Sequence, residues 1–312
     1  MVMKTMSTIN EIERVLLRGY YDYSIIHYPE KNKSIDIIAR KKSDSTNNSR
    51  SFILKVTSSK YVHNNKLVKD LKKMATLSGA LPILIDDQVD EEVINDRDKV
   101  LVMSSTTFEK VVSGEKIFLL KTRGGIFVKI NSKELRKIRE EKGMSLGELA
   151  EKLGVSRISI YDYEKEDSYV SIDVAEKLVD MFGERILGDI ISDFKTEDVK
   201  VDDKDLIVRN DKDVTSLLVK KLAGNGYKIV RFNFTTVDLA ASRDNRKMFF
   251  CIETENVSTS LKKFNEASKL VSKVNGELVV IAKTSKTLKA YEKESFNAYT
   301  VEDIDKIENE IN

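Results

Sequence analysis

The most constraining feature of the sequence is a run of short, capped helices between residues 132 and 183. Ser145 and Glu148 have the spacing of a capping box, in which the serine oxygen accepts a backbone N–H three residues ahead and the glutamate binds back. Gly154 is expected to stop this helix, because glycine adopts the positive φ of a tight turn at little steric cost. Ser156 and Ser171 are placed to cap two further helices. The segment is therefore predicted to be all-helical.

The middle of this segment has the pattern of a helix-turn-helix. That unit is a short helix, a turn of a few residues containing glycine, and a second short helix. Ala150 is small where the two helices must cross, and Val155 and Ile160 are apolar where side chains must face the core. An ordinary helical bundle also has capped helices and glycine stops, but it need not satisfy all of these demands together. We predict a DNA-binding unit whose second helix covers residues 157–164.

Residues 146–164, LGELAEKLGVSRISIYDYE, resemble the lambda-repressor/Cro type of helix-turn-helix, and the resemblance extends over about residues 132–183. It implies that the helix from Arg157 enters the major groove of DNA, N-terminal end first. Arg157 is the candidate for base recognition, because a guanidinium can bridge O6 and N7 of guanine; a phosphate contact or a solvated arginine is the alternative. The DNA-binding residues that the resemblance implies are Ser145, Leu146, Ser156, Arg157, Ile158, Ser159, Tyr161 and Asp162.

Two positions depart from the pattern of this helix-turn-helix type. Glu166 stands where such domains have a glycine, and Val170 stands where they have Pro-Ser. The loop before the fourth helix is therefore expected to differ from the usual one.

An α/β fold is predicted on each side of the helical segment. Residues 9–86 have the order helix, three strands, helix, strand, and a hairpin around Gly124-Gly125 follows. The same order recurs from residue 211, with an aspartate in the middle strand of each copy, which favours a duplication. The predicted parts are an α/β domain with a C-terminal hairpin at 1–130, the helix-turn-helix domain at 131–194, a linker at 195–210 and a second α/β domain at 211–312.

The order of elements in the flanks resembles the restriction-endonuclease-like fold. Active members of that fold hold Mg²⁺ with an aspartate on the second strand and Glu-x-Lys on the third. In the first copy Asp36 and Lys55 match this pattern, but Ile53 occupies the glutamate position. An apolar side chain cannot bind Mg²⁺.

The second copy lacks a different part of the nuclease pattern. Asp238 and Glu253 match it, but Glu255 occupies the lysine position. An acid cannot supply a lysine's positive charge near a phosphate. The four matching positions are therefore predicted to be vestiges of a nuclease site, or plain polar residues on half-buried strands, with no metal and no catalysis.

Composition limits the remaining classes of function. Cys251 is the only cysteine, which excludes an intramolecular disulfide and a thiolate-rich zinc site and suits the reducing cytoplasm. No apolar run reaches the length of a membrane span. Residues 1–130 carry 22 Lys and Arg against 16 Asp and Glu, whereas residues 131–165 carry 8 against 7. This modest charge keeps a protein-interaction adaptor open as an alternative.

The whole chain is similar to an archaeal family named as HTH-type transcriptional regulators, with α/β parts on both sides of the helix-turn-helix. We predict a sequence-specific, cytoplasmic regulator of transcription that binds double-stranded DNA as a homodimer, with no cofactor and no catalysis. The dimer is expected to be held by the flanking domains or by the hairpin. The alternatives are a Mg²⁺-dependent nuclease targeted by the helix-turn-helix and the adaptor.

Overall fold

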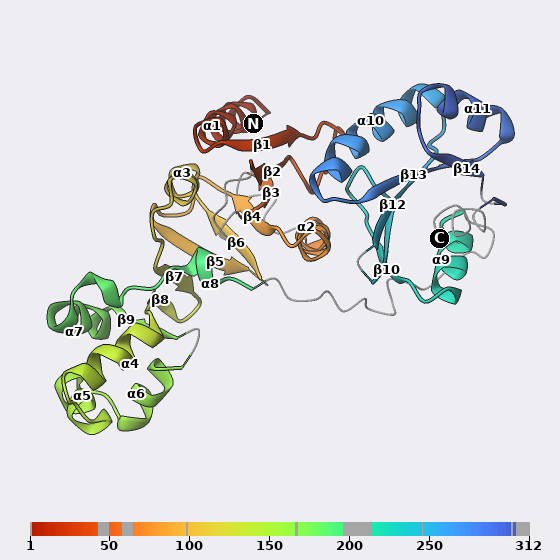
Figure 1. Cartoon of the computed structure of the whole chain (residues 1–312). Coiled ribbons are helices and arrows are strands. Elements are labelled where there is room, and N and C mark those ends of the chain that lie inside the picture. Colours follow the sequence, from red (N-terminus) through yellow and green to blue (C-terminus); the bar gives the residue numbers. More distant parts are fainter. Residues whose placement is uncertain are drawn as a thin grey trace. The chain divides into compact units, whose positions relative to one another are not determined.

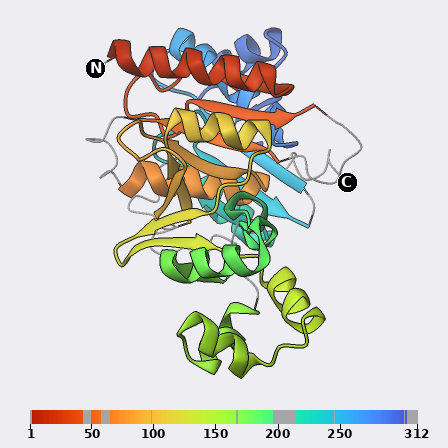
Figure 2. The same cartoon turned by 90° about the vertical axis from the view of Figure 1, so that its left-hand side faces the viewer.

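The computed structural model describes residues 2–42, 50–57, 65–97, 99–165, 168–195, 214–244, 246–300 and 302–303. Its contacts divide the chain into two compact units that interleave along the sequence (Figures 1 and 2). One unit comprises residues 1–19, 56–60 and 83–195, and the other comprises 20–55, 61–82 and 196–312. The predicted linker at 195–210 lies, apart from Lys195, outside the described residues.

The first unit begins with a helix that packs on another helix well separated from it in sequence. Apolar residues at helical spacing, among them Ile12 and Leu16, give α1 one fully buried face, and this helix contacts α3. The strands lie in the order β4-β6-β5-β7-β8-β9, and β4 and β6 are parallel. The bounds of these elements are α1 Val2–Arg18, β4 Leu81–Ile85, β5 Val93–Arg97, β6 Val100–Met103 and α3 Ser105–Ser113.

The predicted hairpin is present in the first unit, with its turn one residue earlier than expected. It consists of β7 (Leu119–Thr122) and β8 (Gly125–Lys129). Thr122 pairs with Gly125, so the two loop residues are Arg123 and Gly124. The Thr122 hydroxyl accepts a hydrogen bond from the Gly124 amide at 3.1 Å, and Gly125, at φ 126°, begins the second strand.

The helical segment of the first unit is attached to this hairpin at both of its ends. Ile130 and Leu187 form an antiparallel bridge, and the Asn131 amide donates to the Ile186 carbonyl at 2.8 Å. A short strand, β9 (Tyr169–Ser171), pairs with β8. Val170, one of the two departures from the repressor pattern, lies in β9 and is buried. A strand therefore precedes the fourth helix, as the departure from the usual loop suggested.

The second unit contains two sets of strands and helices. The first set is β1 (Tyr21–Ile25), β2 (Ile37–Lys41), β3 (Phe52–Val56) and α2 (Asn65–Ser78), with antiparallel strands. In the described part of the second set, five strands lie in the order β10-β11-β12-β13-β14, antiparallel up to β12 and parallel beyond it. Its elements are α9 Val214–Gly224, β10 Lys228–Arg231, β11 Leu239–Arg243, β12 Arg246–Ile252, α10 Val257–Lys273, β13 Glu277–Ala282, α11 Ser285–Lys293 and β14 Ala298–Thr300.

The two sets in the second unit share hydrogen bonds at corresponding places. The amide of Asp36 donates to the carbonyl of Leu54, and the amide of Asp238 donates to the carbonyl of Phe250. The carbonyls of these two aspartates accept from Ile26 and Phe232 respectively. Residues 36 and 238 therefore correspond, as do residues 54 and 250 on the third strands.

A reciprocal contact joins the two sets. On α10, the Glu266 carboxylate accepts from the His27 amide at 2.5 Å. On α2, the Asp70 carboxylate accepts from the amides of Asn233 and Phe234 at 2.8 and 2.7 Å. His27 and Asn233 directly follow residues 26 and 232, which correspond to each other. The helix of each set therefore accepts a hydrogen bond from the equivalent backbone amide of the other set. This is the arrangement of an isologous interface, formed here within one chain.

Candidate nucleic-acid interface

Four helices make up the candidate DNA-binding domain. They are α4 (Ser132–Glu141), α5 (Leu146–Leu153), α6 (Arg157–Tyr163) and α7 (Ile172–Phe182), followed by a 3-10 turn at Glu184–Ile186 and the short α8 at Ile190–Asp193. Figure 1 shows α4, α5 and α6 gathered together, and Figure 2 shows α7 beside the β7–β8 hairpin. The predicted helix-turn-helix is therefore present, and its second helix covers nearly the range expected.

The caps of these helices form as the sequence indicated. The Glu148 amide donates to the Ser145 hydroxyl at 3.2 Å, and the Ser145 amide donates to the Glu148 carboxylate at 2.7 Å. This second bond lowers the pKa of the Glu148 carboxyl. Gly154 ends α5 at φ 73°, and Ser156 caps α6 by accepting from the Ser159 amide at 3.0 Å. Since a cap stabilises a helix by about 1 kcal/mol, these bonds help to define two helices of only seven and eight residues.

The inner faces of the helices share one apolar core. Ile160 of α6 and Leu149 of α5 are fully buried, and Ala150 lies between them in sequence where the helices meet. Val155 packs on the same cluster from the turn. The other buried members are Val128, Ile130, Leu135, Ile138, Leu153, Val170, Val174, Ala175, Leu178, Phe182 and Ile186. This core holds α6 by one side only and leaves its other side exposed.

The exposed side of α6 carries most of the residues predicted to bind DNA. Ile158 is 72% exposed and Tyr161 is 57% exposed, although both are large and apolar or aromatic. Arg157 is exposed at the first position of the helix, and in the described part of the chain its guanidinium has no ion-pair or hydrogen-bond partner. Two large apolar or aromatic side chains on the solvent face of one short helix make this face the candidate contact surface.

The remaining predicted residues lie around this face. Ser145 and Ser156 are exposed caps, whereas Leu146 and Ser159 are half-buried. The Ser159 hydroxyl is 2.9 Å from that of Ser156. Asp162 is exposed but binds the Lys165 ammonium at 2.9 Å, and the same ammonium lies 4.4 Å from the centre of the Tyr161 ring. Lys165 therefore contacts two of the side chains that were predicted to bind DNA.

An ion pair that the sequence analysis missed connects the first helix of the domain, α4, with the end of α6. The Arg139 guanidinium of α4 binds the carboxylate of Glu164, the residue at the C-terminal end of α6, through two bonds of 2.5 and 2.9 Å. The side chains are only 11% and 8% exposed, and the pair raises the pKa of Arg139. A third bond of 2.9 Å runs from this guanidinium to the Met144 carbonyl. The pair thus fixes the C-terminal end of the candidate recognition helix.

The nuclease-like positions of the first set are held by ion pairs. Asp36 is only 3% exposed. One of its carboxylate oxygens binds the Lys33 ammonium at 3.1 Å, and the other binds the Lys55 ammonium at 2.9 Å. Ile53, at the glutamate position, is fully buried. Both oxygens that could coordinate a metal are therefore already paired with cations.

In the second set, the carboxylates of Asp238 and Glu253 form hydrogen bonds and ion pairs in different places. The Asp238 carboxylate binds the Lys263 ammonium at 2.5 Å and the Ile252 amide at 2.7 Å. Glu253 instead accepts from the Lys283 amide at 2.6 Å and from the Thr287 hydroxyl at 2.8 Å, near the start of α11. These bonds give the two carboxylates separate partners.

The third-strand correspondence shows how far the second set differs from a nuclease pattern. Since residue 250 corresponds to residue 54, the positions matching Ile53 and Lys55 are Phe249 and Cys251. Both are fully buried, and burial raises the pKa of the Cys251 thiol. Within the described residues, no group of three or more His, Cys, Asp or Glu side chains is arranged to hold a metal ion.

Family models match two stretches of the chain. Residues 5–117 match the family described as PD-(D/E)XK superfamily domain, and residues 135–187 match a helix-turn-helix family. No solved structure matches the chain. None of the helices in the described part combines the length and the apolarity needed to cross a bilayer.

Curated relatives match almost the full length. A protein of Sulfolobus acidocaldarius is 49% identical over 98% of this chain and 99% of its own length, and one of Sulfurisphaera tokodaii is 50% identical over 96% and 98%. A protein of Saccharolobus islandicus is 39% identical over 97% and 96%. All three carry the name "Putative HTH-type transcriptional regulatory protein". The chain therefore belongs to this archaeal family of HTH-type transcriptional regulators, in which a PD-(D/E)XK superfamily domain is joined to a helix-turn-helix.

Proposed function

We propose that this protein is a cytoplasmic transcriptional regulator that binds specific sequences of duplex DNA through α6 and catalyses no reaction. The observation that carries the proposal is the exposed face of α6. Ile158 and Tyr161 lie in solvent beside Arg157, which has no ion-pair or hydrogen-bond partner among the described residues, while Ile160 anchors the opposite side of the same helix. A helix held in this way can present its N-terminal residues to base edges in the major groove.

The test of sequence specificity is selection of bound duplexes from a random pool with the full chain, followed by affinity measurements on the selected and a random duplex. Arg157→Ala is expected to weaken binding to the selected duplex about tenfold and to relax the preference at one base pair, because a bidentate guanine contact contributes about 1–3 kcal/mol. Arg185→Ala is the matched control, since Arg185 lies in the 3-10 turn, outside α5 and α6. Equal affinity of the unmodified protein for both duplexes would contradict specific binding.

Absence of catalysis is supported by the ion pairs of Asp36 and Asp238, and it is tested against the nuclease alternative with supercoiled plasmid in Mg²⁺ or Mn²⁺. We expect the plasmid to stay intact. Cleavage that is lost in Asp36→Ala or Asp238→Ala would show that the protein is a nuclease targeted by its helix-turn-helix. The adaptor alternative predicts no salt-dependent binding to random duplex, whereas a DNA-binding domain should show it.

We also propose that the protein acts as a homodimer, because one helix-turn-helix contacts only one half-site and such domains commonly bind two-fold sites. Sedimentation at micromolar concentration is expected to give twice the mass of one 35.5 kDa chain. A single monomeric species at that concentration would exclude a stable dimer.

We further propose that residues 211–312 form a second α/β domain related to the first by duplication. The shared element order, the matching bonds of Asp36 and Asp238 and the reciprocal contacts of Asp70 and Glu266 support this relation. In this proposal the α/β domain at 1–130, the helix-turn-helix domain at 131–194 and the linker at 195–210 keep their predicted boundaries.

A further inference from the structure

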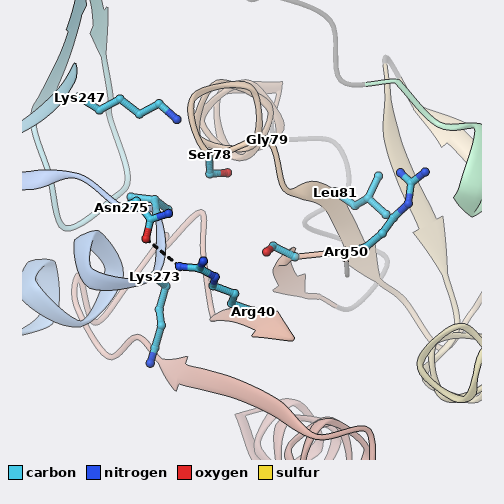
Figure 3. A pocket seen from close by; sticks show the side chains of 10 residues that line it. Arg40, Arg50, Ser78, Gly79, Leu81, Lys247, Lys273 and Asn275 are labelled. Carbon is cyan, nitrogen blue, oxygen red and sulfur yellow. Dashed lines mark hydrogen bonds between the residues drawn. The ribbon is translucent and has the colours of Figure 1, made fainter. Parts of the chain in front are cut away.

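A pocket of about 460 Å³ lies within the second unit, where the two related sets of strands and helices meet. It is formed by the ends of α2 and α10 and by the starts of β3 and β12. Figure 3 shows Lys247 extending from its strand toward the pocket, with Arg40, Asn275 and Ser78 around it and Arg50 on the opposite side. Nothing in the proposed DNA contacts involves this pocket.

The lining residues come in corresponding pairs. The offset of 196 residues that relates Leu54 to Phe250 also relates the reciprocal acceptors Asp70 and Glu266. The same offset pairs Ser51 with Lys247 and Gly79 with Asn275, and all four line the pocket. Gly79 and Asn275 both have positive φ, at 73° and 52°. The pocket is therefore lined by matching positions of the two sets. Both sets are needed to form it.

The lining is strongly basic. Arg40, Arg50, Lys247 and Lys273 all line the pocket, and no acidic side chain does so in the described part of the chain. The Lys273 ammonium is already neutralised by Asp22, at 2.6 Å. The half-buried Lys247 has no such partner among the described residues. Like charges are brought together here at a free-energy cost that an anion would offset.

Hydrogen-bond donors accompany these charges. The Arg40 guanidinium donates to Oδ1 of Asn275 at 2.7 Å, so the amide nitrogen of Asn275 remains available as a donor. Ser51 and Ser78 add hydroxyls to the lining. Guanidinium, ammonium, amide and hydroxyl donors directed at one space are the set that binds phosphate oxygens.

We propose that this pocket binds a small phosphorylated effector that carries two or more phosphates, such as a nucleoside triphosphate or pyrophosphate. The volume falls in the range of small-molecule sites, and such sites are concave and common between related halves of a protein. The phosphates of a DNA backbone are the other source of the same chemistry, but they are presented by a convex duplex. A ligand here contacts both sets at once and would stabilise the contact between them.

The test is calorimetric titration of the full chain with ATP, pyrophosphate and, for comparison, sulfate, without DNA. Either phosphate compound is expected to bind at one site per chain, more tightly than sulfate. Lys247→Gln and Arg40→Gln should each weaken binding at least tenfold, because a charge-assisted hydrogen bond is lost. Lys289→Gln is the matched control, since Lys289 is an exposed lysine on α11, away from the pocket lining.

Each other outcome overturns the proposal. If Lys247→Gln binds the phosphate compound as strongly as the unmodified protein, the compound binds at another site. If neither ATP nor pyrophosphate binds at millimolar concentration, the pocket does not take an effector of this class. If free phosphates do not bind but Lys247→Gln weakens binding to a random duplex, the phosphates are supplied by DNA. Unchanged thermal unfolding of the variants without ligand confirms that they are folded, and none of these results depends on sequence-specific DNA binding.

Discussion

Replacing Glu164 by alanine is expected to lower the free energy of unfolding of the helix-turn-helix by about 3 kcal/mol. The substitution leaves the Arg139 guanidinium, only 11% exposed, without the carboxylate that holds two of its N–H groups. A charge that is buried and has lost its partner keeps the desolvation cost and loses the attraction that offset it. Urea unfolding followed by far-ultraviolet circular dichroism measures the loss, and DNA affinity should fall with it because the C-terminal end of α6 loses its ion pair with α4.

The matched control for this substitution is Glu141→Ala. Glu141 also lies near a cation, the Lys137 ammonium at 3.9 Å, but both side chains are more than half exposed, so little loss of stability is expected. Replacing both members of the buried pair, Arg139→Met with Glu164→Leu, should recover much of the stability, since no charge is then left unpaired. Similar losses for Glu164→Ala and Glu141→Ala would show that the buried pair contributes no more than a surface one.

The substitution Gly276→Ala is expected to destabilise the second unit by about 3 kcal/mol. A Cβ atom at this position would lie 2.6 Å from Cδ2 of Phe249 and closer still to Cε2. The Phe249 ring is fully buried in the sheet and cannot swing away. The added methyl group must therefore push the start of β13 away from β12, and thermal unfolding should report the loss.

Two variants separate this clash from a general effect of removing glycine. Gly224→Ala, at the end of α9, adds a Cβ with no atom within 4 Å and should change the stability little. Phe249→Leu shortens the side chain, so adding Gly276→Ala to it should cost less than it does in the unmodified protein. An equal cost in both backgrounds would rule out the ring as the cause.

The helix-turn-helix could be predicted from the sequence because local signals decide its elements. The capping box at Ser145 and Glu148 and the stop at Gly154 act within a few residues, and the structure has both. The pair between Arg139 and Glu164 could not be predicted in the same way, since its members are 25 residues apart and either could be an ordinary surface charge.

For the regions on either side of the helix-turn-helix, the order of the main helices and strands could be predicted, but some strands were missed. β5 was missed because only Val93 and Ile94 of its five residues are buried, which leaves no alternation to detect. β9 has three residues and depends on pairing with β8. The turn of the hairpin was placed one residue late because Gly124 and Gly125 both satisfy the chemistry of a turn, and only strand pairing distinguishes them.

The nuclease-like positions show a limit of motif matching. Asp36 and Lys55 do lie together, as the pattern indicated. Glu253 fits the spacing in sequence, but the register of β11 with β12 places Phe249 and Cys251 at the matching positions. The basic pocket could not be found at all, since Arg40 and Lys247 are about two hundred residues apart in sequence and come to one pocket only in the folded second unit.

The bridge between Ile130 and Leu187 has a consequence for how this family can diversify. Since the chain enters and leaves the DNA-reading segment at two paired residues, their Cα atoms are about 5 Å apart. Such a segment behaves as a cassette: another repressor-like module with closely spaced ends could be grafted between positions 131 and 186 without redirecting the rest of the chain. Recombination could thus exchange the helix-turn-helix while the rest of the protein is inherited intact.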